Sequence, residues 1–121
     1  MNRNCIVATH SLLLEGKWRL ENLEFDWDEH NIGHIAEHDV TPEEAEQVLL
    51  GDPLEVDFDP DRNGEERCTY LGETAQGRIL TVIMALRGEK MRVVTAFDAV
   101  SRDKLLYLET KAGWYDGPEN P

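Results

Sequence analysis

The pattern of apolar and polar residues divides the chain into a helical part and a strand-rich part. Apolar side chains recur at helical spacing between residues 25 and 50, and they alternate or run together between residues 54 and 97. A last helical pattern begins at Ser101. This order predicts an α+β domain in which two N-terminal helices and one C-terminal helix pack on an antiparallel sheet of about four strands.

Two helix starts are readable in the first part. Asp28 is an N-cap residue and precedes a narrow apolar stripe made of Ile32, Ile35 and Ala36. Thr41 begins a second helix, with Pro42 at the first helical position and Glu44 where a capping box requires it. Gly51 is expected to end this second helix.

The strand-rich part predicts a meander. Residues 54–58 alternate like a half-buried strand, and three further strands over residues 67–72, 78–86 and 91–97 are expected to form the antiparallel meander. The segment 78–86 is apolar on both faces, which predicts the central strand. Ser101 can cap the final helix, with Leu105 and Leu108 facing inward.

The length of 121 residues fits one domain. We expect an N-terminal extension at 1–24, the domain at 25–112 and a flexible tail at 113–121. No window approaches the roughly 20 apolar residues of a membrane span, and the start lacks a signal-peptide pattern, so we expect a cytoplasmic protein. Cys5 and Cys68 match no metal-binding spacing and are expected to be reduced.

The net charge of -13 argues against general nucleic-acid binding, because affinity for phosphate backbones comes largely from Lys and Arg. The charge is uneven, however. Residues 62–111 carry nine Lys and Arg against seven Asp and Glu, whereas the rest of the chain carries three against eighteen. The acidic helical half is therefore suited to docking a basic partner.

Short motifs follow one another in a characteristic order between residues 25 and 109. They read Trp27-Asp28-x-x-Asn31-Ile32-x-His34-Ile35-Ala36-x-His38-x-Val40, Thr41-Pro42-Glu43-Glu44-Ala45-Glu46, Glu65-Glu66-Arg67, Leu71-Gly72, Gly77-Arg78-x-Leu80 and Arg92-Val93-Val94. In this order the motifs resemble the BrnT family of type II toxins, which are small ribonucleases with a RelE-like fold.

The resemblance implies an endoribonuclease that inhibits translation and needs neither a metal nor a cofactor. It implies RNA as the substrate and neutralisation by a small antitoxin with a DNA-binding domain. It implies no membrane partner and leaves a homo-oligomer open.

Metal-free RNA cleavage needs a group that accepts the 2′-hydroxyl proton, a group that protonates the leaving oxygen, and cations on the developing phosphorane. The planar fork of Arg binds phosphate bidentately. The candidate catalytic residues are Arg67, Arg78, Arg92, Arg102, Tyr107 and His38, with His38 orienting or transferring a proton. Further groups able to transfer protons are His34, Glu66 and Asp103. The alternative for each arginine is an ordinary surface ion pair.

Two positions depart from the family pattern. Phe97 stands where the family usually has Arg, and Asp103 stands where it usually has Glu. Losing one cationic contact predicts reduced nuclease activity. The alternative function is a catalytically inactive toxin-derived domain that acts as a protein-interaction module through its acidic half.

A third reading concerns three histidines, His30, His34 and His38, which recur every four residues and would share one helix face. Two such side chains can bind a metal together with a nearby carboxylate. No HExxH pattern is present, so we favour an exposed helix surface and predict no metal site.

Overall fold

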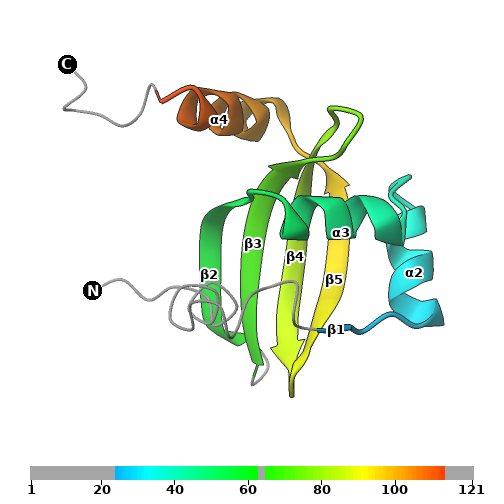
Figure 1. Ribbon diagram of the computed structural model, residues 1–121. Helices are drawn as coiled ribbons and strands as arrows, with labels where there is room; N and C mark the ends of the chain where they lie inside the picture. Colours follow the sequence, from blue (N-terminus) through cyan, green and yellow to red (C-terminus); the bar gives the residue numbers. More distant parts are fainter. Residues whose placement is uncertain (1–23, 63–64, 114–121) are drawn as a thin grey trace.

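The computed structural model describes residues 24–62 and 65–113 (Figure 1). The expected N-terminal extension at 1–24 and the expected tail at 113–121 therefore lie almost wholly outside the described residues. Within the described part, three helices accompany one five-stranded sheet, which confirms the predicted α+β class.

The sheet has the strand order β1-β5-β4-β3-β2. Four long strands form an antiparallel meander, and they are β2 (Leu54–Arg62), β3 (Glu65–Glu73), β4 (Ile79–Arg87) and β5 (Lys90–Asp98). The last three are the strands predicted to do so, and β2 extends the meander by one strand. β4 lies in the middle of the order, so the prediction of a central strand over residues 78–86 is confirmed.

The expectation of about four antiparallel strands is wrong in one respect. A fifth strand, β1 (Glu24–Phe25), pairs in parallel with β5 at Lys90 and Met91, so the sheet is mixed. With two residues, β1 is too short to produce an alternating pattern that sequence analysis could detect.

Both predicted helix starts in the first half are confirmed. The side chain of Asp28 accepts hydrogen bonds from the backbone N–H groups of His30 and Asn31 and begins α2 (Glu29–Ala36). Thr41 and Glu44 form the reciprocal capping box of α3 (Pro42–Leu50). Gly51 is the C-cap of α3, as expected.

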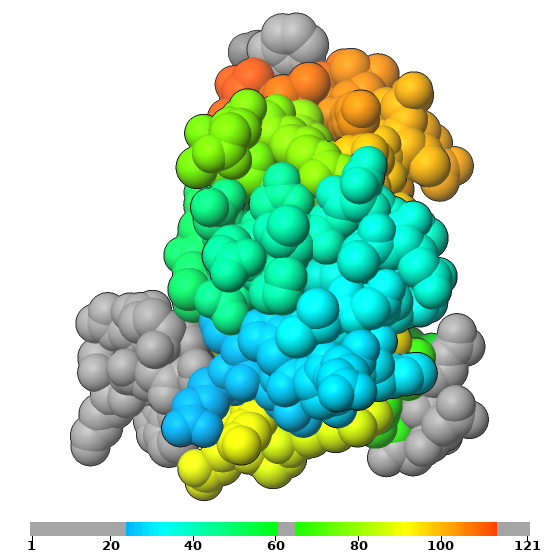
Figure 2. All heavy atoms as spheres, turned by 90° about the vertical axis from the view of Figure 1, so that its right-hand side faces the viewer, coloured from blue at the N-terminus to red at the C-terminus, as the bar shows by residue number. Residues whose placement is uncertain are grey.

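The two helices lie differently against the sheet. α3 crosses one face over β3 and β4, whereas α2 stands beside β5 (Figure 1). Figure 2 shows α2 and α3 side by side, with α4 (Ser101–Lys111) at the opposite end of the molecule from the β4–β5 turn. Because α2 lies at the edge, only Ile35 of its expected apolar stripe is buried, while Ile32 is 39% exposed.

The main core lies between α3 and the sheet. It contains Ile35, Val40, Ala45, Val48 and Leu49 from the helical part, with strand residues including Tyr70, Leu80, Val82, Met84, Met91, Val93 and Ala96. Gly72 permits the close approach of α3, because a Cβ atom there would lie 2.6 Å from Cγ1 of Val48.

A β-bulge interrupts the pairing of β4 with β5. Ile83 pairs with Thr95 and Met84 pairs with Val93, so Val94 is the extra residue. Val93 and Ala96 both belong to the core, and the two residues between them, Val94 and Thr95, are only half-buried. The bulge therefore directs two consecutive side chains toward the face opposite α3.

The expected packing of α4 is wrong. Its N-cap is Val100, which makes no side-chain cap, and Leu105 and Leu108 are 55% and 52% exposed. Tyr107 is buried instead, in a small second cluster with Leu71 and Ala99. α4 meets only the end of the sheet, and the tyrosine ring fills this contact.

Cys68 lies buried in β3 and is disulfide-bonded, so the expectation of reduced cysteines is wrong for this residue. Among the described helices, none is long and apolar enough to span a membrane.

Candidate functional site

Three arginines meet on the sheet face opposite α3. Arg67 of β3 and Arg92 of β5 are both register partners of Ala85 in β4, so they flank a small side chain. Arg87 lies two residues beyond Ala85 on the same strand and therefore on the same face. The strand register thus gathers three guanidinium groups from three neighbouring strands.

The three arginines line a pocket of about 220 Å³. Its other lining residues are His30 and Asn31 from the first turn of α2, together with Val93 and Val94 of β5. Asn31 is 1% exposed, and its side-chain amide donates to the carbonyl oxygens of Val93 (3.1 Å) and Asp26 (2.9 Å). These bonds fix the start of α2, and with it His30, beside the arginines.

Carboxylates position the arginines. Glu65 accepts from Arg87 at 2.8 Å and from Arg67 at 3.2 Å, so it bridges the two side chains. The hydrogen bond from Arg87, helped by Arg67, lowers the pKa of Glu65. The same contact with Glu65 raises the pKa of Arg87. Both Glu65 and Arg87 therefore stay charged at neutral pH.

Arg92 is the most buried of the three, with 9% of its surface exposed. Its two terminal nitrogens each lie 3.1 Å from an oxygen of Asp28, and Asp26 lies 3.5 Å away. The hydrogen bond from Arg92 is the main reason that the pKa of Asp28 falls to about 2. The helix N-cap and the β5 arginine are thereby joined through one carboxylate.

Each guanidinium has five donors, so three clustered arginines that keep spare N–H groups can bind an anion. The imidazole of His30, which also lines the pocket, adds a side chain of the kind that accepts and donates protons. A pocket with this chemistry can hold a phosphate group and move a proton beside it.

Comparison with protein families identifies the chain. The family model for the ribonuclease toxin BrnT of type II toxin–antitoxin systems matches residues 27–103, which is more than half of the chain. The chain belongs to the BrnT family. Comparison with curated proteins finds no match. Family membership makes the chain a ribonuclease toxin whose partner is an antitoxin, and it does not favour the alternative of an inactive interaction module.

Arg67 and Arg92 are the two predicted site residues that this BrnT-family structure brings together. Arg78 lies apart from them. Its guanidinium donates to the carbonyl oxygen of Asp39 (2.7 Å), to Glu44 (2.9 Å) and to Asp98 (3.0 Å). It therefore ties the α2–α3 turn and the start of α3 to the end of β5.

Arg102 and Tyr107 lie on α4, near the opposite end of the sheet. The Arg102 side chain is 87% exposed and lies 3.8 Å from Asp103. Tyr107 is 5% exposed, and burial raises the pKa of its hydroxyl. Neither residue lines the arginine pocket.

His38 lies beyond the end of α2 and contacts the rings of His34 (centroids 5.6 Å apart) and Phe97 (5.9 Å). Phe97 is the register partner of Thr81, which in turn pairs with Leu71 beneath α4. The departure at position 97 is therefore remote from the arginine pocket. Among the described residues, no group of three or more His, Cys, Asp or Glu side chains could hold a metal.

Sequence analysis missed Arg87 and His30 as members of this site. Arg87 stands in a hairpin turn motif, and only the β3–β4 register places it beside Glu65 and Arg67. In the sequence, His30 stands out only as part of a histidine face. Its position two residues after the N-cap Asp28, which binds Arg92, is the signal that could have found it.

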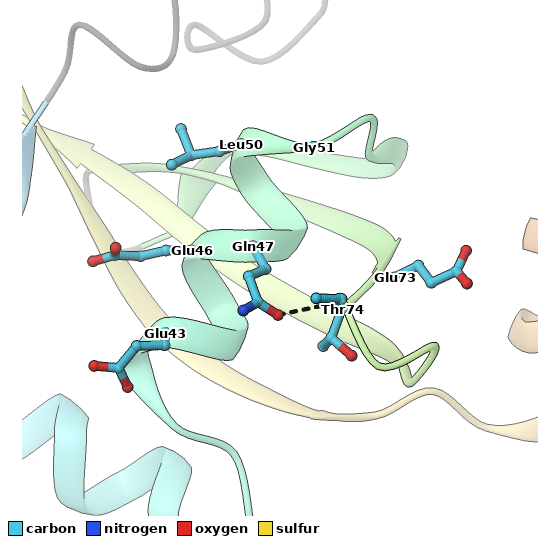
Figure 3. Close-up of a pocket in the computed structure, with 8 residues that line it drawn as sticks. Glu43, Glu46, Gln47, Leu50, Gly51, Glu73 and Thr74 are labelled. Carbon is cyan, nitrogen blue, oxygen red and sulfur yellow. Dashed lines mark hydrogen bonds between the residues drawn. The ribbon is translucent and has the colours of Figure 1, made fainter.

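Another pocket, of about 570 Å³, lies elsewhere, between α3 and the β3–β4 turn (Figure 3). Gln47 spans it by accepting a hydrogen bond from the backbone N–H of Ala75. Its other lining residues include Glu43, Glu46 and Glu73 and no basic side chain. Phosphate is disfavoured there, and the acidic rim suits a basic partner.

Proposed function

We propose that this BrnT-family toxin cleaves RNA at the pocket formed by Arg67, Arg87 and Arg92. The convergence of these three guanidinium groups around one pocket carries the proposal. Their charge would stabilise the phosphorane, which is the role that metal-free cleavage assigns to cations. The reaction requires no metal ion in this account, and the protein acts in the cytoplasm, where cutting RNA stops translation.

His30 is the proposed proton-transfer group. It is the imidazole that lines the arginine pocket, and it is exposed to solvent. A neutral imidazole can accept the 2′-hydroxyl proton, and its protonated form can donate to the leaving oxygen. Of the candidate residues predicted from the sequence, Arg67 and Arg92 keep a catalytic role, which is to stabilise the phosphorane. Arg78, Arg102, Tyr107 and His38 have no catalytic role in this proposal.

The arrangement of elements supports a RelE-like fold for the domain between residues 25 and 112. Two helices precede an antiparallel meander, and a third helix follows it. For the antitoxin we propose a small protein with a DNA-binding domain, as the family resemblance implies.

Induced expression in a bacterial host tests the proposed function, with growth and total RNA integrity followed together. We expect growth arrest and degraded RNA with the natural sequence, and neither effect with Arg67→Gln combined with Arg87→Gln. Arg102→Gln is the control for the loss of one positive charge outside the pocket, because its side chain is 87% exposed. Intact RNA with the natural sequence, or arrest that survives the double change, would overturn the proposal.

A further inference from the structure

A second pocket, of about 290 Å³, adjoins the arginine pocket and shares Arg67 and Val94 with it. Its remaining lining residues are Asp57, Asp59, Thr69, Ile83 and Thr95. The volume is at the lower end of the range for small-molecule sites, which fits one flat ring system. A ligand that filled both pockets would place a ring beside a bound phosphate.

The strand register builds this second pocket. Asp57, Thr69, Ile83 and Thr95 are successive register partners across β2, β3, β4 and β5, so each strand contributes one side chain to a single row. The next row contains Arg67 opposite Asp59. The β-bulge supplies Val94 beside Thr95 and so adds an apolar wall to the row.

The pocket lining combines apolar side chains with hydrogen-bond donors and acceptors. Ile83 and Val94 offer apolar surface for a ring face, while Asp57 offers carboxylate acceptors. The Asp57 side chain is exposed, and within the described residues its carboxylate makes no hydrogen bond or ion pair. The Nε atom of Arg67 is enclosed and has no hydrogen-bond acceptor in the same described part. The Asp57 carboxylate can therefore accept hydrogen bonds from a ligand, and the Nε–H group of Arg67 can donate one.

We propose that this second pocket binds a guanine base of the RNA, next to the phosphate that the three arginines hold. The inference rests on the proposed function, since it names the base that lies beside the bound phosphate. Guanine presents two adjacent donors, N1–H and the N2 amino group, which one carboxylate can accept together. It also presents the O6 and N7 acceptors, to which Arg donates.

Other bases match this lining less well. Adenine and cytosine offer one amino group beside a ring acceptor, which a carboxylate repels. Uracil offers a single N–H between two carbonyl groups. Recognition of unpaired bases through these edges is the usual way in which proteins read RNA sequence. Asp57 is thus the proposed specificity-determining residue, and Arg67 contacts both the base and the phosphate.

Titration of the full chain with mononucleotides tests the inference. The probes are guanosine 3′-monophosphate, adenosine 3′-monophosphate, guanosine and inorganic phosphate, and calorimetry gives each Kd. We expect the guanine nucleotide to bind at least about fivefold more tightly than the adenine nucleotide, which is the lower end of what one bidentate pair supplies. Asp57→Asn should bring this ratio close to one.

The readout is the ratio of the Kd values for the guanine and adenine nucleotides. Asp57→Asn removes a negative charge and so strengthens the binding of both phosphates, and this effect cancels in the ratio. Glu43→Gln is the matched control: it removes the same charge from an exposed residue beside the remote α3 pocket, and the ratio should not change.

Equal binding of both nucleotides, with phosphate binding retained, would overturn the guanine pocket alone. If guanosine binds but phosphate adds no affinity, the guanine pocket stands and the arginine site fails. If no probe binds, both are overturned.

Discussion

The carboxylate of Asp28 both caps a helix and pairs with an arginine. Its side chain caps α2 by accepting from the backbone N–H groups of His30 and Asn31, and it also accepts from Arg92. The cap fixes where the helix begins, and the arginine fixes that beginning against β5. The position of His30 beside the arginine pocket depends on both contacts.

The pH dependence of stability should reveal the charge on Asp28. Its pKa of about 2 in the folded protein lies below the ordinary value of 3.8, so its contribution is present at neutral pH and is lost as the pH falls toward 2. Asn is also a good N-cap, so Asp28→Asn removes mainly the pairing with Arg92. In urea unfolding, the stability difference between the natural protein and Asp28→Asn should be full at neutral pH and shrink below about pH 4. A difference that stays constant down to about pH 3 would contradict this.

Phe97 provides a second prediction at the scale of one residue. It lies five residues beyond Arg92 along β5, a separation of roughly 15 Å, and its ring contacts His38. Phe97→Arg should therefore leave the rate of RNA cleavage within about threefold of the natural rate, far less than the effect of one transition-state contact. A rise of about a hundredfold would show that the catalytic cations extend to position 97.

Residue type and spacing predicted Arg67 and Arg92 but could not separate them from Arg78. All three are strand or strand-entrance arginines in short motifs. Arg67 and Arg92 differ from Arg78 in the face of the sheet on which they lie and in the carboxylates that they contact. Arg78 faces Glu44 and Asp98, and these contacts arise only from tertiary structure.

At the scale of elements, the contact between α3 and β3 determines how closely helix and sheet approach. Gly72 lies against Val48, and both positions are buried. Local signals fixed the helix starts, because capping depends on residues a few positions apart. The short parallel strand β1, the bulge at Val94 and the burial of Tyr107 depend on partners far along the chain, so local patterns did not reveal them.

Gly72→Ala should destabilise the protein. The added Cβ would lie 2.6 Å from Cγ1 of Val48, so the helix or the strand must shift, and such overpacking costs about 1–3 kcal/mol. Gly33→Ala is the matched control within α2: a Cβ there meets nothing within 4 Å, and stability should rise by about 0.5–1 kcal/mol. Thermal and urea unfolding measure both.

A double-mutant cycle makes the same prediction more specific. Val48→Ala removes the atom that the new Cβ meets, so the combined change should cost less than the two single changes added together. Strict additivity would show that Gly72 is needed for a reason other than its contact with Val48.

At the scale of the whole molecule, two pockets on different faces differ in their charged side chains. The arginine pocket opens on the sheet face opposite α3, whereas the pocket of about 570 Å³, with its glutamates, lies beside α3. The net charge of -13 repels RNA in general, so the proposed RNA binding would depend on a few local cations rather than on a basic surface. The overall charge was readable from composition, but the gathering of three arginines required the strand register.

The salt dependence of RNA binding should report this small number of cations. For three phosphate contacts to single-stranded RNA, log K should fall with log salt with a slope of roughly -2, and Arg67→Gln should reduce the slope by about 0.7. Arg102→Gln should leave it unchanged. A slope near zero, or one that Arg102→Gln and Arg67→Gln alter equally, would contradict binding at the arginine pocket.

The most direct test of the central claim is the single-turnover rate of RNA cleavage by purified protein carrying Arg67→Gln, Arg87→Gln or Arg102→Gln. Circular dichroism would first establish that each variant is folded. The account predicts that each of the first two changes lowers the rate by about a hundredfold or more, while Arg102→Gln remains near the natural rate. Equal rates for all three variants would contradict the assignment of catalysis to this pocket.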